Sequence, residues 1–234
     1  MNLESFDGII ACGDSYTIGP VVDGTLFMED SWPAILGKKL NLPVVNLSRG
    51  GASNTEISLQ PLNTLSKFER PLLIFGFTVD YRIPYFNSMG NLHSMYGLLD
   101  SDFVYENKRA DTSNKIGLAK PWMQSFLLPT ENGLTGVQNM FVESINRIFA
   151  WERLIPNSKV IWGVLHSTTA EGPAVEDCIT NTIPEEYMAS CFNIDNIPYE
   201  ALSLIEYQIS PTDQHPNKEG LEIYANSIKS FIST

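Results

Sequence analysis

The feature of this sequence that most constrains its fold is the alternation of short apolar runs with segments of helical periodicity. Buried strands are predicted at residues 6–13 (FDGIIACG), 42–48 (LPVVNLS), 70–78 (RPLLIFGFT) and 158–167 (SKVIWGVLHS), with a fifth near 205–210 (IEYQIS). Helices are predicted at 31–41, 55–69, 137–157 and 217–233. Strands separated by helices pair in parallel through right-handed crossovers. The chain is therefore expected to form a three-layer α/β/α sandwich.

The length and composition fit a single domain that spans residues 1–234. With 43% hydrophobic residues, the chain has enough apolar side chain for one packed core. Two connections, about 81–136 and 167–201, are longer than simple links between strands and helices. Because long connections commonly form lids or binding loops, both are expected to contact a ligand rather than to form a second domain.

The charge and hydropathy of the chain exclude some classes of function. A net charge of −12 argues against general binding to nucleic acid or to anionic membranes, since both require clustered Lys and Arg. No apolar run reaches the roughly 18 residues of a membrane span, and MNLESFDG lacks the basic-then-apolar profile of a secretory leader. A cytoplasmic location is expected, and association with a virion or release by another route is left open.

The cysteines predict neither a disulfide framework nor a zinc knuckle. Cys12, Cys178 and Cys191 are odd in number and show no Cys-x-x-Cys spacing. Cys12 lies inside the first apolar run and is expected to be a small core residue, whereas a bridge between Cys178 and Cys191 has no support. No metal and no cofactor is expected, and no feature of the sequence predicts an oligomeric state.

Small and polar residues gather beyond the predicted strands, at the edge of an open parallel sheet where ligands bind. They include a serine, a histidine and an aspartate. A serine hydroxyl becomes a nucleophile when an imidazole takes its proton, and a carboxylate orients that imidazole. Amides flanked by glycine can donate hydrogen bonds to an oxyanion. These segments are 13–15 (GDS), 50–54 (GGASN), 76–78 (GFT) and 213–217 (DQHPN).

The order of these blocks resembles the SGNH hydrolase superfamily, or GDSL-type esterases, in its short intracellular or phage-like form. GDSYTIG (13–19) matches the block that ends the first strand, and NLSRGGASN places Gly51 five residues after Asn46, as in the second block. DQHPNKEGLEIYA (213–225) resembles the last block through its His-Pro-Asn and the helix that follows. The fold that this resemblance implies is a flavodoxin-like parallel sheet of five strands in the order 2-1-3-4-5.

The resemblance also implies a chemistry, the hydrolysis of a short-chain acyl ester such as an O-acetyl group on a carbohydrate. Ser15 would be the nucleophile, His215 the base and Asp213 the acid of the triad. The amides of Ser15 and Gly51, together with Thr78, would hold the oxyanion, and no metal would be needed. Neighbouring Asp14 is expected to cap backbone amides and not to take part in catalysis.

Two positions depart from the family's pattern. Thr78 stands where the third block has an oxyanion-binding asparagine, and loss of one such donor typically costs about 100- to 1,000-fold in rate. Asp213 precedes His215 by two positions instead of three, and Thr212 occupies the usual place of the acid. A backbone carbonyl is the alternative partner for the imidazole.

Each candidate residue also has an ordinary structural interpretation. Ser15 could cap a helix, His215 could lie in a surface turn, and Gly51 could serve only a tight turn. Asn54 and Arg82 are secondary candidates for substrate binding. Asn54 could instead open the next helix through an Asx turn, and Arg82 could form a surface ion pair.

Two other functions fit the same fold. One is a binding or structural protein, for example a phage component, that keeps the pocket without efficient turnover, and the two departures favour it. The other is a flavodoxin-like nucleotide binder. It is weaker because no Gly-x-Gly-x-x-Gly or Gly-x-x-x-x-Gly-Lys-Ser/Thr pattern follows any predicted strand.

Overall fold

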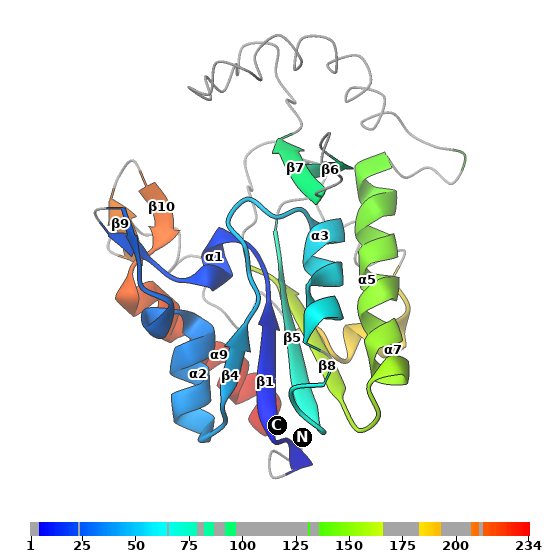
Figure 1. The fold of residues 1–234 in the computed structure, drawn as a ribbon, viewed down its shortest axis with the longest axis horizontal. Helices are drawn as coiled ribbons and strands as arrows, with labels where there is room; N and C mark the ends of the chain where they lie inside the picture. The colour runs from blue at the N-terminus through cyan, green and yellow to red at the C-terminus, as the bar shows by residue number, and fades with distance from the viewer. Residues whose placement is uncertain are drawn as a thin grey trace, which may run out of the picture.

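Four parallel strands form the central sheet, in the order β4-β1-β5-β8. The structure, a computed structural model, describes residues 5–22, 24–64, 66–78, 82–86, 92–96, 131, 136–165, 183–192, 207–210 and 213–234. Helices cover both faces of the sheet (Figure 1), which confirms the mixed α/β class with a parallel sheet. The strands are β1 (Gly8–Cys12), β4 (Val44–Asn46), β5 (Pro71–Phe77) and β8 (Lys159–Val164).

The first four predicted strands take the predicted order, and the fifth does not join them. Residues 208–210 form β9 (Gln208–Ser210), which pairs antiparallel with β10 (Asp213–Pro216) in a separate ribbon. Only two residues separate these strands, and so short a link permits antiparallel pairing, whereas a parallel neighbour needs a long crossover. At the free edge of β8, Cys191 makes a parallel bridge to Trp162.

Each face of the sheet packs against its own pair of helices (Figure 1). Helices α2 (Trp32–Leu40) and α9 (Lys218–Ser233) cover one face, and α3 (Asn54–Leu59) and α5 (Gly136–Leu154) cover the other. Alternate side chains of β1 enter the two cores, because successive residues of a strand point to opposite faces. Ile9 and Ala11 join the core under α2 and α9, and Ile10 and Cys12 join the core under α3 and α5.

The helix ends follow local signals in the sequence. Ser31 caps α2, with its Oγ accepting from the Ala34 amide at 3.4 Å, and Asn217 caps α9 by accepting from the Gly220 amide at 3.0 Å. The second predicted helix, 55–69, is α-helical only up to Leu59, just before Pro61, and a 3₁₀ turn, η3 (Gln60–Asn63), continues it. Proline clashes with the preceding helical turn and has no N–H to donate, which accounts for the change.

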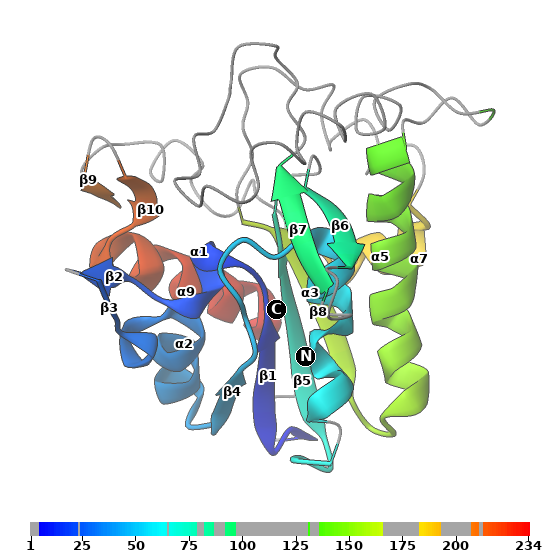
Figure 2. The same cartoon turned by 45° about the horizontal axis from the view of Figure 1, so that its top comes forward.

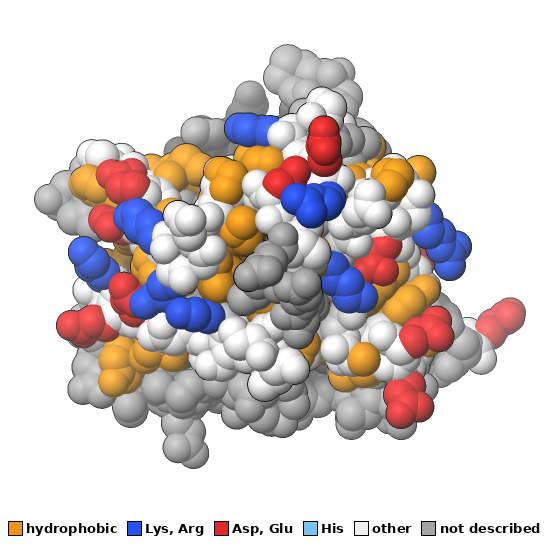
Figure 3. Space-filling view, turned by 90° about the horizontal axis from the view of Figure 1, so that it is seen from below, with side chains coloured by type: hydrophobic (Ala, Val, Ile, Leu, Met, Phe, Trp, Pro, Cys, Tyr) orange, Lys and Arg blue, Asp and Glu red, His pale blue; other side chains and the backbone are white. Residues whose placement is uncertain are grey.

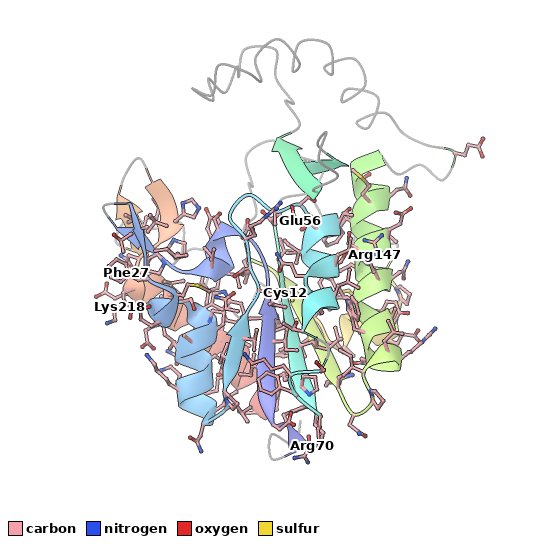
Figure 4. The ribbon with its side chains drawn as sticks, in the orientation of Figure 1. Cys12, Phe27, Glu56, Arg70, Arg147 and Lys218 are labelled. Atoms are coloured by element: carbon pink, nitrogen blue, oxygen red, sulfur yellow. The ribbon has the colours of Figure 1, made fainter. Side chains whose placement is uncertain are left out.

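Helix α3 is anchored to α5 by polar contacts at one residue, Ser58. Arg147 Nη1 donates to Ser58 Oγ at 2.8 Å, and Trp151 Nε1 donates to the Ser58 carbonyl at 2.9 Å. Figure 4 shows Arg147 on α5 beside α3. These two hydrogen bonds hold the C-terminal end of α3, and the residues that follow it, against α5.

Smaller elements lie around this framework. Figure 2 shows two hairpins near the carboxyl ends of the parallel strands, the β6–β7 hairpin on the side of α3 and α5 and the β9–β10 ribbon on the side of α2 and α9. The hairpin and α7 belong to the long connections 81–136 and 167–201, which otherwise lie largely outside the described residues. The smaller elements are α1 (Ser15–Ile18), β2 (Val21–Val22), β3 (Thr25–Leu26), η2 (Met28–Asp30), β6 (Arg82–Phe86), β7 (Leu92–Tyr96) and α7 (Glu185–Met188).

One face of the molecule and the two described cysteines can be compared with the expectations for charge and thiols. Acidic and basic side chains are interspersed on the face at the amino ends of the strands (Figure 3). No helix within the described ranges is both long and apolar enough to cross a bilayer. Cys12 and Cys191 are free thiols, and Cys178 lies outside the described residues. Burial raises the pKa of the Cys12 thiol well above its ordinary value and raises the pKa of Cys191 to about 12.

Candidate functional site

Ser15 is the first residue of α1, directly beyond the carboxyl end of β1. The residue before it, Asp14, caps this short helix: Asp14 Oδ1 accepts from the Tyr16 amide at 2.9 Å. The Asp14 carbonyl accepts from the amides of Thr17 and Ile18, both at 3.0 Å. The fully buried carboxylate of Asp14 is therefore a capping group, as predicted.

The amide and the hydroxyl of Ser15 are not used by the fold itself. An amide at the first position of a helix has no acceptor within that helix. Among the residues that the structure describes, neither the Ser15 amide nor its hydroxyl makes a hydrogen bond. The side chain is half-buried. The Ser15 amide and hydroxyl are therefore available to form hydrogen bonds with a bound ligand.

Gly13, two residues before Ser15, packs closely against the side chain of Thr17. A Cβ atom there would lie 2.1 Å from Thr17 Oγ1, so only glycine fits. The Gly13 amide donates to Gln60 Oε1 at 2.8 Å, and its carbonyl accepts from Gln60 Nε2 at 2.9 Å and from the Arg49 amide at 3.1 Å. All main-chain hydrogen-bonding groups of Gly13 are thus satisfied.

The loop after β4 carries Gly51 in a backbone conformation with φ of +78°, which favours glycine. In the same loop the Arg49 amide donates to the Gly13 carbonyl, and the Arg49 guanidinium pairs with the carboxylate of buried Glu56 on α3. Figure 4 shows Glu56 at the end of α3 nearest the carboxyl ends of the strands. Within the described part of the chain, the Gly51 amide makes no hydrogen bond.

Asn54 and Thr78 are joined by two hydrogen bonds between a side-chain amide and the main chain. Asn54 Oδ1 accepts from the Thr78 amide at 2.9 Å, and Asn54 Nδ2 donates to the Thr78 carbonyl at 3.1 Å. Ser53, not Asn54, caps α3, because Ser53 Oγ accepts from the Glu56 amide at 3.3 Å. Thr78 is fully buried, and its hydroxyl has no partner among the described residues.

His215 lies on β10 and reaches α1 through an aromatic contact. Its ring centroid is 4.9 Å from that of Tyr16, with an angle of 33° between the ring planes. Tyr16 directly follows Ser15, so the fold brings the first and last predicted blocks together although they lie at opposite ends of the sequence. The Ser15 hydroxyl and the imidazole are not hydrogen-bonded to each other.

Asp213 and Arg82 are placed only through their main chains. Asp213 pairs with Ser210 in the β9–β10 ribbon, and Arg82 pairs with Tyr96 in the β6–β7 hairpin. Their side chains lie outside the described residues. Within the described ranges, no group of three or more His, Cys, Asp or Glu side chains is suited to hold a metal ion.

Sequence reasoning missed Gln60 and the contact of Tyr16 with His215. Gln60 precedes a proline in an interrupted helix, and nothing in that pattern indicates where its amide points. Asn46 carried a clearer signal, because it begins the second resembling block. Asn46 Nδ2 donates to the Thr17 carbonyl at 3.0 Å and so braces α1 from the neighbouring strand.

Comparison with known proteins finds solved structures with a similar fold but no matching family profile or curated sequence. No protein-family profile and no curated protein matches the chain. A protein assigned to the lipolytic G-D-S-L family from Desulfitobacterium hafniense DCB-2 is 16% identical, with 96% of this chain and 99% of that chain covered and a TM-score of 0.52. The psychrotrophic esterase EstA from Pseudoalteromonas sp., in a structure inhibited by monoethylphosphonate, is 14% identical, with 97% and 100% covered and a TM-score of 0.52.

A third solved structure is that of a carbohydrate esterase whose active site has divergent catalytic and non-catalytic binding functions. It is 11% identical, with 97% of this chain and 68% of that chain covered and a TM-score of 0.53. At these identities the likeness concerns the fold alone. The chain therefore shares its α/β fold with G-D-S-L lipolytic proteins and esterases.

Proposed function

We propose that this protein is a serine hydrolase of the esterase or deacetylase type, from the short intracellular or phage-like branch of the SGNH superfamily. The observation that carries the proposal is the contact between His215 and Tyr16, because it brings an imidazole to the residue next to Ser15. Ser15 lies beyond the carboxyl end of β1, where open parallel sheets bind their ligands. The fold shared with esterases supports the same reaction class.

In the proposed reaction His215 takes the proton of the Ser15 hydroxyl, and Ser15 Oγ attacks the ester carbonyl. His215 then returns the proton to the leaving alcohol, which yields an acyl-enzyme, and a water activated by the same imidazole releases the acid. Asp213 or a backbone carbonyl orients the imidazole. The resting arrangement without a Ser15–His215 hydrogen bond is compatible with this scheme, since catalytic hydrogen bonds often tighten only when substrate is bound.

The oxyanion is held by the amides of Ser15 and Gly51 and by the hydroxyl of Thr78. These groups share one property: each lacks a hydrogen-bond partner among the described residues. The loop that carries Gly51 is bound to the end of β1 through Arg49, and the helix that follows is bound to Thr78 through Asn54. These hydrogen bonds support the proposal that the Ser15 amide, the Gly51 amide and the Thr78 hydroxyl lie close enough to bind one oxyanion.

The substrate class that we propose is a small-molecule or carbohydrate ester with a short acyl group, such as O-acetyl. The likeness in fold to a carbohydrate esterase supports a carbohydrate ester as the substrate. Arg82 and Asn54 are proposed as secondary substrate contacts. Asn54 Nδ2 has a second hydrogen besides the one given to Thr78, and that hydrogen is the part of Asn54 suited to this role.

The test is covalent labelling with a fluorophosphonate together with hydrolysis of p-nitrophenyl acetate. The wild-type protein is expected to be labelled, and Ser15→Ala is expected to lose labelling and to lower kcat by at least about 10⁴-fold. Ser66→Ala, which changes an exposed serine, is the control and should behave as wild type. Failure of the folded wild-type protein to label or to hydrolyse the ester would overturn the proposal.

A non-catalytic binding protein on the same fold is the second candidate. It is favoured by Thr78 in place of asparagine and by the absence of a hydrogen bond between the Ser15 hydroxyl and His215. This candidate predicts that the wild-type protein binds an acetylated oligosaccharide in calorimetry, with no labelling at Ser15. Hydrolysis that depends on Ser15 would exclude it.

A further inference from the structure

Gln60 holds the main chain next to the candidate nucleophile from a position 47 residues away in sequence. Its side-chain amide bonds Gly13 twice, accepting from the Gly13 N–H at 2.8 Å and donating to the Gly13 carbonyl at 2.9 Å. This pairing requires a donor and an acceptor on one planar group, which an amide provides. With the Arg49 amide as its second donor, the Gly13 carbonyl has no free lone pair.

The hydrogen bonds of Gln60 to Gly13 also affect the orientation of Ser15. Because a peptide unit is planar and trans, the direction of the Gly13 carbonyl also sets the direction of the Asp14 amide. The Asp14 carbonyl is held in turn by the amides of Thr17 and Ile18. Two successive peptide units before Ser15 are thus oriented, and they define where the amide and the side chain of Ser15 begin.

The same device recurs at the neighbouring strand. Asn54 bonds both main-chain groups of Thr78 beyond β5, as Gln60 bonds those of Gly13 beyond β1. Asn54 and Gln60 are the two ends of the segment 54–60, which Ser58 fixes to α5. One segment therefore links the two strand ends that carry the candidate nucleophile and the candidate oxyanion hydroxyl.

We propose that Gln60 is a positioning residue for acyl transfer at Ser15, acting through the main chain of Gly13. The inference rests on the proposed function and extends it to a residue that does not contact substrate. A loss of this pairing lets the peptide before Asp14 rotate, which displaces the Ser15 amide and hydroxyl. Displacements of about 1 Å in a catalytic group can cost on the order of 100-fold in rate.

The test compares Gln60→Met with Gln60→Glu. Gln60→Met keeps the length of the side chain and removes both hydrogen bonds, so we expect kcat for p-nitrophenyl acetate to fall about 10- to 100-fold with KM little changed. Gln60→Glu keeps the acceptor for the Gly13 amide, but its ionised carboxylate faces the Gly13 carbonyl without a proton to donate. A protonated carboxyl group has the donor and the acceptor of the amide.

The pH dependence separates positioning from a general loss of structure. We expect the kcat of Gln60→Glu relative to wild type to rise as the pH falls from 7 to 5, because protonation restores the second hydrogen bond. The same ratio for Gln60→Met should stay flat. Taking the ratio removes any effect of pH that is common to all the proteins. Circular dichroism at the assay temperature verifies that each variant is folded.

The outcomes distinguish this inference from the proposed function. If wild type is labelled and active while both variants keep kcat within twofold, Gln60 is no positioning residue and the proposed function stands. If Gln60→Met does not fold, the pH ratio of Gln60→Glu alone decides, and a flat ratio overturns the inference. If wild type neither labels nor turns over ester, the proposed function and this inference are both wrong.

Discussion

Thr78 combines full burial with a hydroxyl that has no partner among the described residues. A buried hydroxyl without a hydrogen bond destabilises a fold by roughly 1–3 kcal/mol relative to a satisfied one. Such a group persists more readily where it serves a ligand, and the resemblance described in the sequence analysis places an asparagine at this position. The chemical role of Thr78 is therefore best tested by separating its hydroxyl from its methyl group.

Thr78→Val and Thr78→Ser make that separation. Thr78→Val removes the hydroxyl at nearly constant volume, so kcat should fall by about 100-fold or more while the free energy of unfolding is unchanged or higher. Thr78→Ser keeps the hydroxyl and loses a buried methyl, so kcat should hold while stability falls by about 1 kcal/mol. Urea unfolding and ester kinetics measure the two effects. Equal kcat for both variants would remove Thr78 from the oxyanion site.

At the scale of elements, the β9–β10 ribbon is what carries His215 to α1. Asn217 ties this ribbon to α9. Its Oδ1 caps the helix through Gly220, its Nδ2 donates to the Gln208 carbonyl at 3.2 Å, and its amide donates to the Tyr207 carbonyl at 2.8 Å. A single side chain therefore joins the helix cap to the strand that pairs with β10.

Asn217→Ala and Asn217→Asp separate the helix cap from the hydrogen bond to Gln208. Asn217→Ala removes the cap and should lower the free energy of unfolding by about 1 kcal/mol. Asn217→Asp keeps the cap acceptor and loses only the donor to Gln208, so stability should stay near wild type. Both variants should lower kcat, because the ribbon that holds His215 is loosened. If Asn217→Asp retains full kcat, the contact with Gln208 does not help to place the imidazole.

At the scale of the whole molecule, the reactivity of the two described free thiols, Cys12 and Cys191, measures whether the sheet is intact. Cys12 lies in the central strand β1 and Cys191 bridges to the edge strand β8. Burial raises the pKa of both, to about 12 for Cys191, so both are neutral and unreactive in the folded protein at pH 8. In a Cys178→Ser background, a thiol reagent at pH 8 should react with neither until denaturant is added.

The sign of the pH effect follows from the raised pKa values. An unfolded cysteine ionises near its ordinary value of 9.0, whereas the folded protein retains the proton until the pH reaches about 12 for Cys191. The contribution to stability is fully present below pH 9 and is lost as the pH rises from about 9 toward 12. Urea unfolding at pH 8 and pH 10.5 should show a smaller loss for Cys191→Ala than for wild type. An equal loss would show that this thiol does not ionise on unfolding.

The parts of the fold that could be predicted depend on residues close together in sequence. The cap of α2 at Ser31 and the cap of α9 at Asn217 each involve an amide three residues further on, and the break at Pro61 is a property of proline itself. The capping role of Asp14 is of the same local kind. Ser15, Gly51 and His215 were singled out by their order in the chain, and their catalytic roles stay predictions.

The sequence by itself determined the alternation of strands and helices and the beginnings of α2 and α9, because short-range propensity and local caps decide these. The order of the first four strands was expected from the resemblance to a known family. Only the tertiary structure decided that residues 208–210 pair with β10 and that the Gln60 amide bonds Gly13. It also decided that His215 packs on Tyr16. Such contacts join side chains that are distant in sequence, and their geometry exists only once the strands and helices are packed.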